Sequence, residues 1–149
     1  VFATIPKGRK IFVEVKCGKE IIPHLVKEIS KSKLKAEQIV LICFGQEVVK
    51  AFKQALPKNK AYWLCSFKQN EEGLWEPSLE TVLATLKETK ADGLDSHHGI
   101  PASAAKKIMK EGYEWHAWTV NDGATAKKLK ALGIHSITTD RPGLIRSSL

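Results

Sequence analysis

The sequence predicts an α/β fold in which parallel strands form a sheet and helices cover it from outside. Short apolar runs rich in β-branched and aromatic residues alternate with longer stretches whose apolar residues recur every three or four positions. The two patterns recur about every 20 to 30 residues, which is the length of one strand–helix unit. Strands that alternate with helices in this way are expected to pair in parallel.

Six segments have the character of strands, and one connecting segment stands out between them. Residues 68–77 are polar but include Trp75, and we expect them to form a loop. A doubly wound open sheet and a stretch of a (β/α)-barrel both fit six strands. The expected strands are residues 11–16, 39–44, 61–67, 93–97, 114–120 and 135–140.

Five stretches between the strands have the apolar spacing of an amphipathic helix. In the first, Ile22, Val26 and Ile29 follow the i, i+4, i+7 template. Asp122 is expected to cap the start of the last long helix, and Gly133 to end it. The other helices are centred on residues 48–55, 79–86, 104–109 and 126–132.

Composition indicates one globular domain, residues 1–149, without a membrane span. The chain has 149 residues, of which 43% are hydrophobic, and no apolar run approaches the roughly 20 residues that cross a bilayer. No signal-peptide pattern is present, so the compartment stays open between cytoplasmic and periplasmic or secreted. The chain begins at Val1, which suggests a processed or truncated product, whether natural, engineered or proteolytic.

The net charge of +8 leaves open whether nucleic acid is a partner. The lysines are scattered over the expected helix faces, which favours a solvated outer ring over a nucleic-acid footprint. A nucleic-acid-binding module is therefore kept only as an alternative. The scattered residues are Lys27, Lys31, Lys50, Lys53, Lys106, Lys107, Lys110, Lys127, Lys128 and Lys130.

Cysteine and motif patterns exclude several kinds of site. Cys17, Cys43 and Cys65 are far apart and odd in number, which argues against a disulfide framework or a structural zinc site. Cys43 and Cys65 lie in apolar runs and are expected to be buried thiols. The sequence has no GxSxG, HExxH or glycine-rich phosphate loop, so covalent serine catalysis is unsupported.

Polar residues gather where the expected strands end, which is where parallel α/β folds place their active sites. In the first strand Glu14 and Lys16 are two residues apart and therefore face the same side. A carboxylate there can ligate a hard cation such as Mg²⁺ or Ca²⁺, and a lysine beside it can hold a phosphate oxygen. The alternative is an ordinary Glu–Lys pair on an edge strand.

Other strand ends offer weaker candidates. Asp122 and Arg141 each open an expected helix, whose N-terminus can bind an anion or carry only a cap. Trp118 lies near the end of its strand and is either core or a surface on which a small polyol stacks. His97 and His98 are adjacent, so we expect them to point to opposite sides of an extended chain, which is poor geometry for joint metal binding.

Four segments resemble those of the glycerophosphodiester phosphodiesterase family. Residues 11–16 (IFVEVK) are similar to the family's "IEIK" strand, and residues 118–121 (WTVN) match its "WTVN" strand. Residues 137–142 (ITTDRP) are similar to its closing "ITDRP" strand, and residues 91–94 (ADGL) to the short strand before "WTVN". Order and spacing agree over nearly the whole chain.

The resemblance implies the C-terminal part of a (β/α)-barrel, TIM-barrel-like, with about six strand–helix units. Family members hydrolyse glycerophosphodiesters, small molecules of lipid metabolism, to glycerol 3-phosphate and an alcohol. They use a divalent cation, Mg²⁺ or Ca²⁺, held by three carboxylates, and two histidines for acid–base work. By motif, Glu14 matches the third metal carboxylate, Lys16 the lysine that contacts phosphate, and Trp118 the wall of the glycerol pocket. Asp140 and Arg141 match structural positions.

The family's "HRG", "ENT", "EFD" and "HD" segments have no counterpart in this sequence, and its "SF" is Cys43-Phe44 here. The missing segments carry both catalytic histidines and two metal carboxylates, so we expect no catalytic residue in this chain and no activity from it alone. Open sheet edges predict a homo-oligomer or pairing with the part that supplies the missing strands. The alternative is a non-catalytic α/β domain that binds a phosphorylated metabolite.

Overall fold

The computed structural model describes all residues, Val1–Leu149. They form two compact units, one of Val1–Leu64 and Ala84–Asp92, the other of Cys65–Leu83 and Gly93–Leu149. None of the helices is both long enough and apolar enough to span a bilayer. That residues 1–149 make up a single domain stays a prediction.

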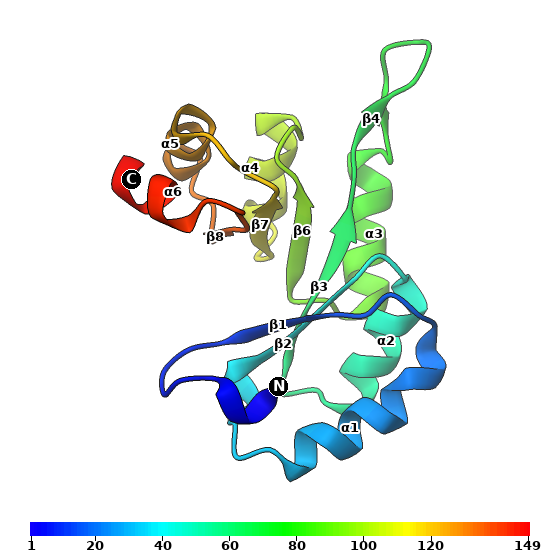
Figure 1. Cartoon of the computed structure of the whole chain (residues 1–149). Helices are drawn as coiled ribbons and strands as arrows, with labels where there is room; N and C mark the ends of the chain where they lie inside the picture. Colours follow the sequence, from blue (N-terminus) through cyan, green and yellow to red (C-terminus); the bar gives the residue numbers. More distant parts are fainter. The chain divides into compact units, whose positions relative to one another are not determined.

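The first unit is built on three parallel strands in chain order, with the helices between them (Figure 1). All but one of the residues in the middle strand, β2, are buried, as is typical of a parallel strand covered on both faces. Helix α2 packs against β2 and against α1. The elements are β1 (Ile11–Glu14), α1 (Ile22–Lys31), β2 (Ile39–Cys43), α2 (Gln46–Ala55), β3 (Lys60–Cys65) and the second half of α3 (Leu79–Thr89), with 3-10 turns at Phe2–Thr4, Lys19–Ile21 and Ala36–Gln38.

The second unit repeats the pattern with three more parallel strands. Helix α4 packs against β7, and α5 packs against α6 (Figure 1). The elements are a hairpin of β4 (Lys68–Gln69) and β5 (Trp75–Glu76), then β6 (Gly93–His97), α4 (Ala102–Lys110), β7 (Glu114–Trp118), α5 (Gly123–Ala131), β8 (Ser136–Ile137) and α6 (Pro142–Ser148).

Helix ends follow the expected capping chemistry. The Asp122 carboxylate accepts a hydrogen bond of 2.8 Å from the Thr125 N–H and so caps α5. Gly133, just beyond the end of α5, has a φ of +92°, a conformation that side-chain-bearing residues avoid. Both sequence assignments are confirmed.

Two segments differ from the sequence prediction. Residues 68–77 form a β-hairpin instead of an irregular loop, closed by the Asn70 side chain, whose Oδ1 accepts from the N–H groups of Glu72 (3.1 Å) and Leu74 (2.9 Å). The last strand is only Ser136–Ile137, because the Asp140 N–H turns away to the side chain of Asn121 at 2.9 Å.

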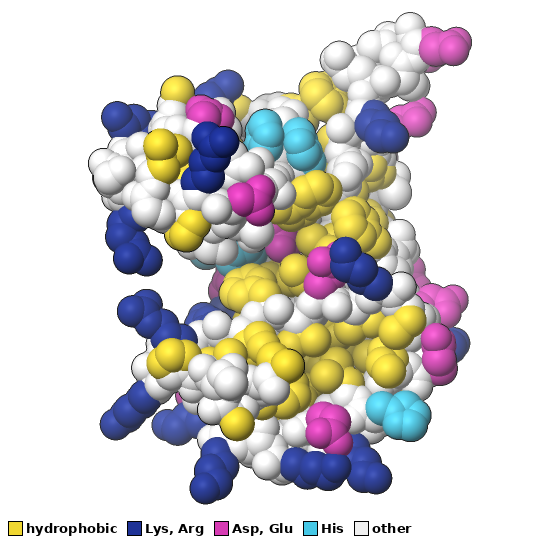
Figure 2. All heavy atoms as spheres, viewed as in Figure 1, with side chains coloured by type: hydrophobic (Ala, Val, Ile, Leu, Met, Phe, Trp, Pro, Cys, Tyr) yellow, Lys and Arg dark blue, Asp and Glu magenta, His cyan; other side chains and the backbone are white.

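Lysine and arginine side chains stand out around the perimeter of the view in Figure 2, and do not form one stripe. Lys53 is the exception to the expected solvated ring. Its side chain is only 9% exposed, and its ammonium donates to Asp92 at 2.8 Å. The helical period of α2 identified the helix but not this neighbour, which is 39 residues further along the chain.

Candidate functional site

Glu14 and Lys16 lie at the carboxyl end of β1 and face the same way, as the strand period predicts. Along β1 half-buried and exposed residues alternate, and Glu14 is on the exposed side. The Lys16 ammonium lies 3.4 Å from a Glu14 carboxylate oxygen, and their side chains are 79% and 36% exposed. The pair is therefore open to solvent, where either side chain can turn to another partner at little cost.

A divalent cation needs more donors than this pair supplies. Mg²⁺ and Ca²⁺ take six or more oxygen ligands, of which several are usually carboxylates. Within each of the two described units, no group of three or more His, Cys, Asp or Glu side chains is placed to hold a metal ion. Glu14 is the one carboxylate that the sequence assigns to a cation, and that role stays a prediction.

The Cys43 thiol belongs to the last residue of β2 and is held by two hydrogen bonds inside the same unit. It is buried, donates to the Val15 carbonyl at 3.0 Å, and accepts from the Gly45 N–H at 3.3 Å. Burial raises the pKa of Cys43 and raises that of the buried Cys65 to about 11. Both thiols therefore stay protonated near neutral pH, and their expected burial is confirmed.

Trp118 lies at the carboxyl end of β7 in the second unit, where its orientation is fixed by β6. Its indole N–H donates to the Asp95 carbonyl at 3.1 Å, and its own carbonyl accepts from the His98 N–H at 3.0 Å. The rings of His97 and Trp118 make an edge-to-face contact, with their centroids 5.7 Å apart. Trp118 is half-buried, so one part of the ring packs in the unit while another part is accessible.

His97 and His98 do not point to opposite sides, and that prediction is wrong. Their ring centroids are 4.2 Å apart, because β6 ends at His97 and the chain turns at His98. The pKa of His97 lies below its ordinary value, first because its ring is partly desolvated and second because His98 repels a positive charge. His97 Nδ1 accepts from the Gly99 N–H at 3.3 Å, which suits the neutral ring.

Replacing His98 with glutamine should raise the pKa of His97, because one of the two causes of its depression is removed. In the wild type, His97 is protonated more readily in the unfolded chain than in the folded one as the pH falls below about 6.5. Acidification below this pH therefore lowers the free energy of unfolding. An NMR titration of the His97 ring protons measures the shift. His24→Gln, a change on the exposed surface of α1, is the control; equal titration in all three proteins would contradict the assignment.

Asn121 and Asp140 join the loops that follow β7 and β8. The Asn121 amide donates to the Asp140 carboxylate at 2.8 Å, and its Oδ1 accepts from the Thr139 hydroxyl at 3.0 Å and the Asp140 N–H at 2.9 Å. The two motifs WTVN and TDRP are thus connected through their polar residues. This clasp accounts for Asn121, whose role the sequence did not indicate, and supports the structural reading of Asp140.

The helix starts at Asp122 and Arg141 are poor anion sites. The Asp122 carboxylate already occupies the N-terminal N–H of Thr125 at α5, and that hydrogen bond is the main reason why the pKa of Asp122 is lowered. An incoming phosphate would meet this negative charge. Helix α6, which follows Arg141, is only seven residues long, so its dipole is weak.

Solved phosphodiesterase structures share this fold. A glycerophosphodiester phosphodiesterase from Parabacteroides distasonis is 24% identical, with a TM-score of 0.75 over 95% of this chain and 57% of that chain. An Oleispira antarctica phosphodiesterase in complex with the product sn-glycerol-3-phosphate is 19% identical, with a TM-score of 0.77 over 93% of this chain and 54% of that one. A glycerophosphodiester phosphodiesterase from Thermotoga maritima is 17% identical, with a TM-score of 0.73 over 98% of this chain and 60% of that one.

The chain thus spans a little more than half the length of these structures, and the predicted (β/α)-barrel fold, present in part, is confirmed. No curated protein matches the chain by sequence. The profile of the Glycerophosphoryl diester phosphodiesterase family matches residues 5–144, which include Glu14, Lys16, Trp118 and the WTVN and TDRP segments. The chain therefore belongs to the Glycerophosphoryl diester phosphodiesterase family.

Proposed function

We propose that the protein to which these residues belong hydrolyses glycerophosphodiesters to glycerol 3-phosphate and an alcohol, with the help of Mg²⁺ or Ca²⁺. The observation that carries the proposal is the Glu14–Lys16 pair at the carboxyl end of β1, in a chain that matches the phosphodiesterase family over residues 5–144. The product bound to the Oleispira antarctica relative, sn-glycerol-3-phosphate, has the chemistry expected of such a site.

Each residue has a defined task in this proposal. Glu14 donates one carboxylate oxygen to the cation, which would supply charge stabilisation to the phosphate when bound. The Lys16 ammonium, held only loosely at 3.4 Å, turns from Glu14 to a phosphate oxygen and offsets its negative charge. The half-buried Trp118 ring forms an apolar wall for the carbon side of glycerol.

These residues bind and orient, but none is placed to move a proton. Water must attack phosphorus while the alcohol oxygen takes up a proton, and acid–base help of this kind contributes about 10²-fold to 10⁴-fold. With one cation donor and no assigned acid or base, the 149-residue chain alone is proposed to be inactive. The rest of the barrel, or another chain, would supply those groups.

The test uses a completed barrel, in which the 149 residues are extended with the missing strands. In this protein Glu14→Gln should lower glycerol phosphate release about 100-fold or more, because a charged oxygen donor is lost. Release from glycerophosphocholine and glycerophosphoethanolamine is measured with Mg²⁺, with Ca²⁺ and with chelator. Glu47→Gln is the matched control, since Glu47 is an exposed carboxylate that pairs with Lys19 at 3.5 Å in the same unit.

The outcomes separate the candidate functions. Metal-dependent release by the completed barrel, lost with Glu14→Gln and kept with Glu47→Gln, supports the phosphodiesterase. Release by the 149-residue chain alone would contradict its proposed inactivity. Binding of glycerol 3-phosphate without hydrolysis in the completed barrel would favour the alternative, a non-catalytic domain for a phosphorylated metabolite.

A further inference from the structure

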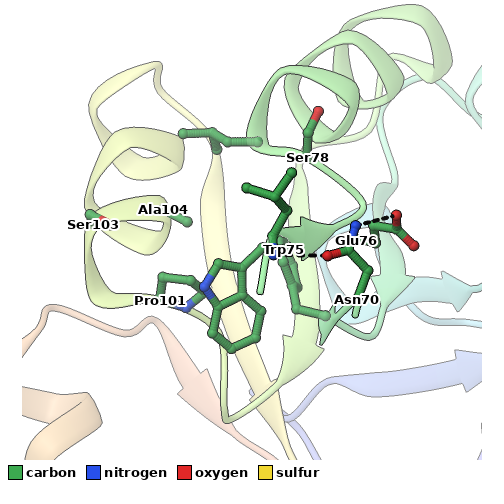
Figure 3. Close-up of a pocket in the computed structure, with 10 residues that line it drawn as sticks. Asn70, Trp75, Glu76, Ser78, Pro101, Ser103 and Ala104 are labelled. Atoms are coloured by element: carbon green, nitrogen blue, oxygen red, sulfur yellow. Dashed lines mark hydrogen bonds between the residues drawn. The ribbon is translucent and has the colours of Figure 1, made fainter. Parts of the chain in front are cut away.

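A cavity of about 530 Å³ lies in the second unit, between the β4–β5 hairpin and the first turns of α3 and α4. Figure 3 shows the Trp75 indole beside Pro101, with Ala104 on the facing helix. The volume falls within the range of about 300 to 1,000 Å³ that is usual for small-molecule pockets. Six apolar residues make up most of its wall: Phe67, Leu74, Trp75, Leu79, Pro101 and Ala104.

Three of the four polar side chains that line the cavity, all but Ser103, are already engaged. The Asn70 amide donates to the Glu76 carboxylate at 3.0 Å, a bond drawn in Figure 3. Ser78 accepts from the Thr81 N–H at 3.2 Å and shares a hydrogen bond with the Thr81 hydroxyl. A ligand that offered its own charge or hydrogen bonds would have to break these pairs, whereas an apolar ligand would leave them intact.

Two of the apolar residues are exposed to water although they line a concave surface. Leu74 is 60% exposed and Trp75 is 37% exposed. Covering them would remove apolar area from water and is therefore favourable, by about 25 cal/mol for each Å². The cavity is thus suited to an aliphatic group.

Two residues that line the cavity, Phe67 and Pro101, follow the carboxyl ends of β3 and β6. The hairpin begins three residues after Cys65, the last residue of β3. Pro101 follows the turn at the end of β6, in which the His98 N–H donates to the Trp118 carbonyl. In (β/α) folds the active site lies at these carboxyl ends. A phosphodiester carries an alcohol on each side of its phosphorus, and Trp118 accounts for only one of them in the proposed function.

We propose that this cavity binds the apolar chain of the alcohol that leaves the phosphodiester. That the ligand is the leaving alcohol rests on the proposed function. That the ligand is apolar rests on the lining of the cavity alone. The substrate class is then a glycerophosphodiester of an aliphatic alcohol, rather than one of a small cationic alcohol.

Binding of 1-butanol, 1-hexanol and 1-octanol to the 149-residue chain tests the chemistry without turnover. The indole N–H signal of Trp75 in a ¹H–¹⁵N NMR titration reports the site. Each added methylene should tighten Kd about fourfold, which corresponds to about 0.8 kcal/mol per buried CH₂. Choline is titrated as the cationic comparison; a Trp75 shift with choline and none with the alkanols would overturn the proposal, as would a Kd independent of chain length.

Leu74→Ser should weaken 1-hexanol binding about tenfold, because the loss of one apolar wall removes between about one and two methylene equivalents of contact. Leu74 is 60% exposed, so the substitution leaves folding nearly unchanged. Leu144→Ser is the control, since Leu144 is an exposed leucine (47%) on α6, outside the cavity. Equal binding by the two variants would overturn the assignment of the site.

The completed barrel distinguishes this inference from the proposed function. If it hydrolyses glycerophosphoalkanols with kcat/KM rising along the chain-length series, both stand. Hydrolysis without dependence on chain length overturns the cavity's role but keeps the phosphodiesterase. Alkanol binding without any hydrolysis overturns the proposed function and, with it, the role of the cavity as a pocket for the leaving alcohol.

Discussion

Gly93→Ala is expected to lower the free energy of unfolding by about 3 kcal/mol, at the upper end of the range for overpacked interiors. Gly93 opens β6 and lies directly opposite Glu114 in β7. A Cβ atom built on Gly93 falls on the Glu114 carbonyl oxygen, with the carbonyl carbon only 2.8 Å away. Because these are backbone atoms of a paired strand, no side-chain rotation can relieve the overlap.

Urea unfolding measures this loss as a lower midpoint at an unchanged m-value. Gly143→Ala is the matched control, since a Cβ at Gly143, in α6, meets no atom within 4 Å. Alanine should stabilise that helix by about 0.5 to 1 kcal/mol. Similar midpoints for the two variants would mean that β6 and β7 approach each other less closely than described.

Asp92→Ala is expected to cost about 2 to 3 kcal/mol of stability, because it leaves a nearly buried ammonium without its counter-charge. One Asp92 oxygen accepts hydrogen bonds of 2.8 Å from both the Lys53 ammonium and the Ala61 N–H. Lys53 also donates to the carbonyls of Pro57 and Asn59, at 3.1 and 2.9 Å. The carboxylate therefore links α2, the loop after it and the start of β3.

Thermal and urea unfolding of Asp92→Ala should be compared with those of Glu88→Ala. Glu88 pairs with Lys50 at 2.9 Å, but the two side chains are 69% and 44% exposed, so its removal should cost about 0.5 kcal/mol or less. A loss no larger for Asp92 than for Glu88 would show that Lys53 finds adequate solvation without its partner.

The alternation of strands and helices could be predicted from the sequence because the spacing of apolar residues differs between a strand and a helix. All five expected helices and all six expected strands are present, and residues 93–97 are a strand as predicted. The hairpin at 68–77 could not be predicted in this way, because strands of two residues show no period. The only signal for it was local: Asn70 followed by Gly73, which adopts a φ of +76°.

The site was predictable where it depends on strand geometry and not where it depends on turns. Glu14 and Lys16 face the same way because they are two residues apart at the end of β1. The same rule failed for His97 and His98, because the strand ends between them. The Asn121–Asp140 clasp and the Lys53–Asp92 pair join residues 19 and 39 positions apart, and no periodic pattern reports such contacts.

The strand pairing within each unit also bears on how fast the chain assembles. Ile11 pairs with Ile39 and His116 with Ser136, so each ladder closes a loop of only roughly 20 to 30 residues. The entropy lost on closing a loop grows slowly with its length, and folding rates fall as contacts become more distant in the chain. Each of these strands therefore needs only its immediate predecessor as a template, so the ladders of a unit can form one after the other along the chain.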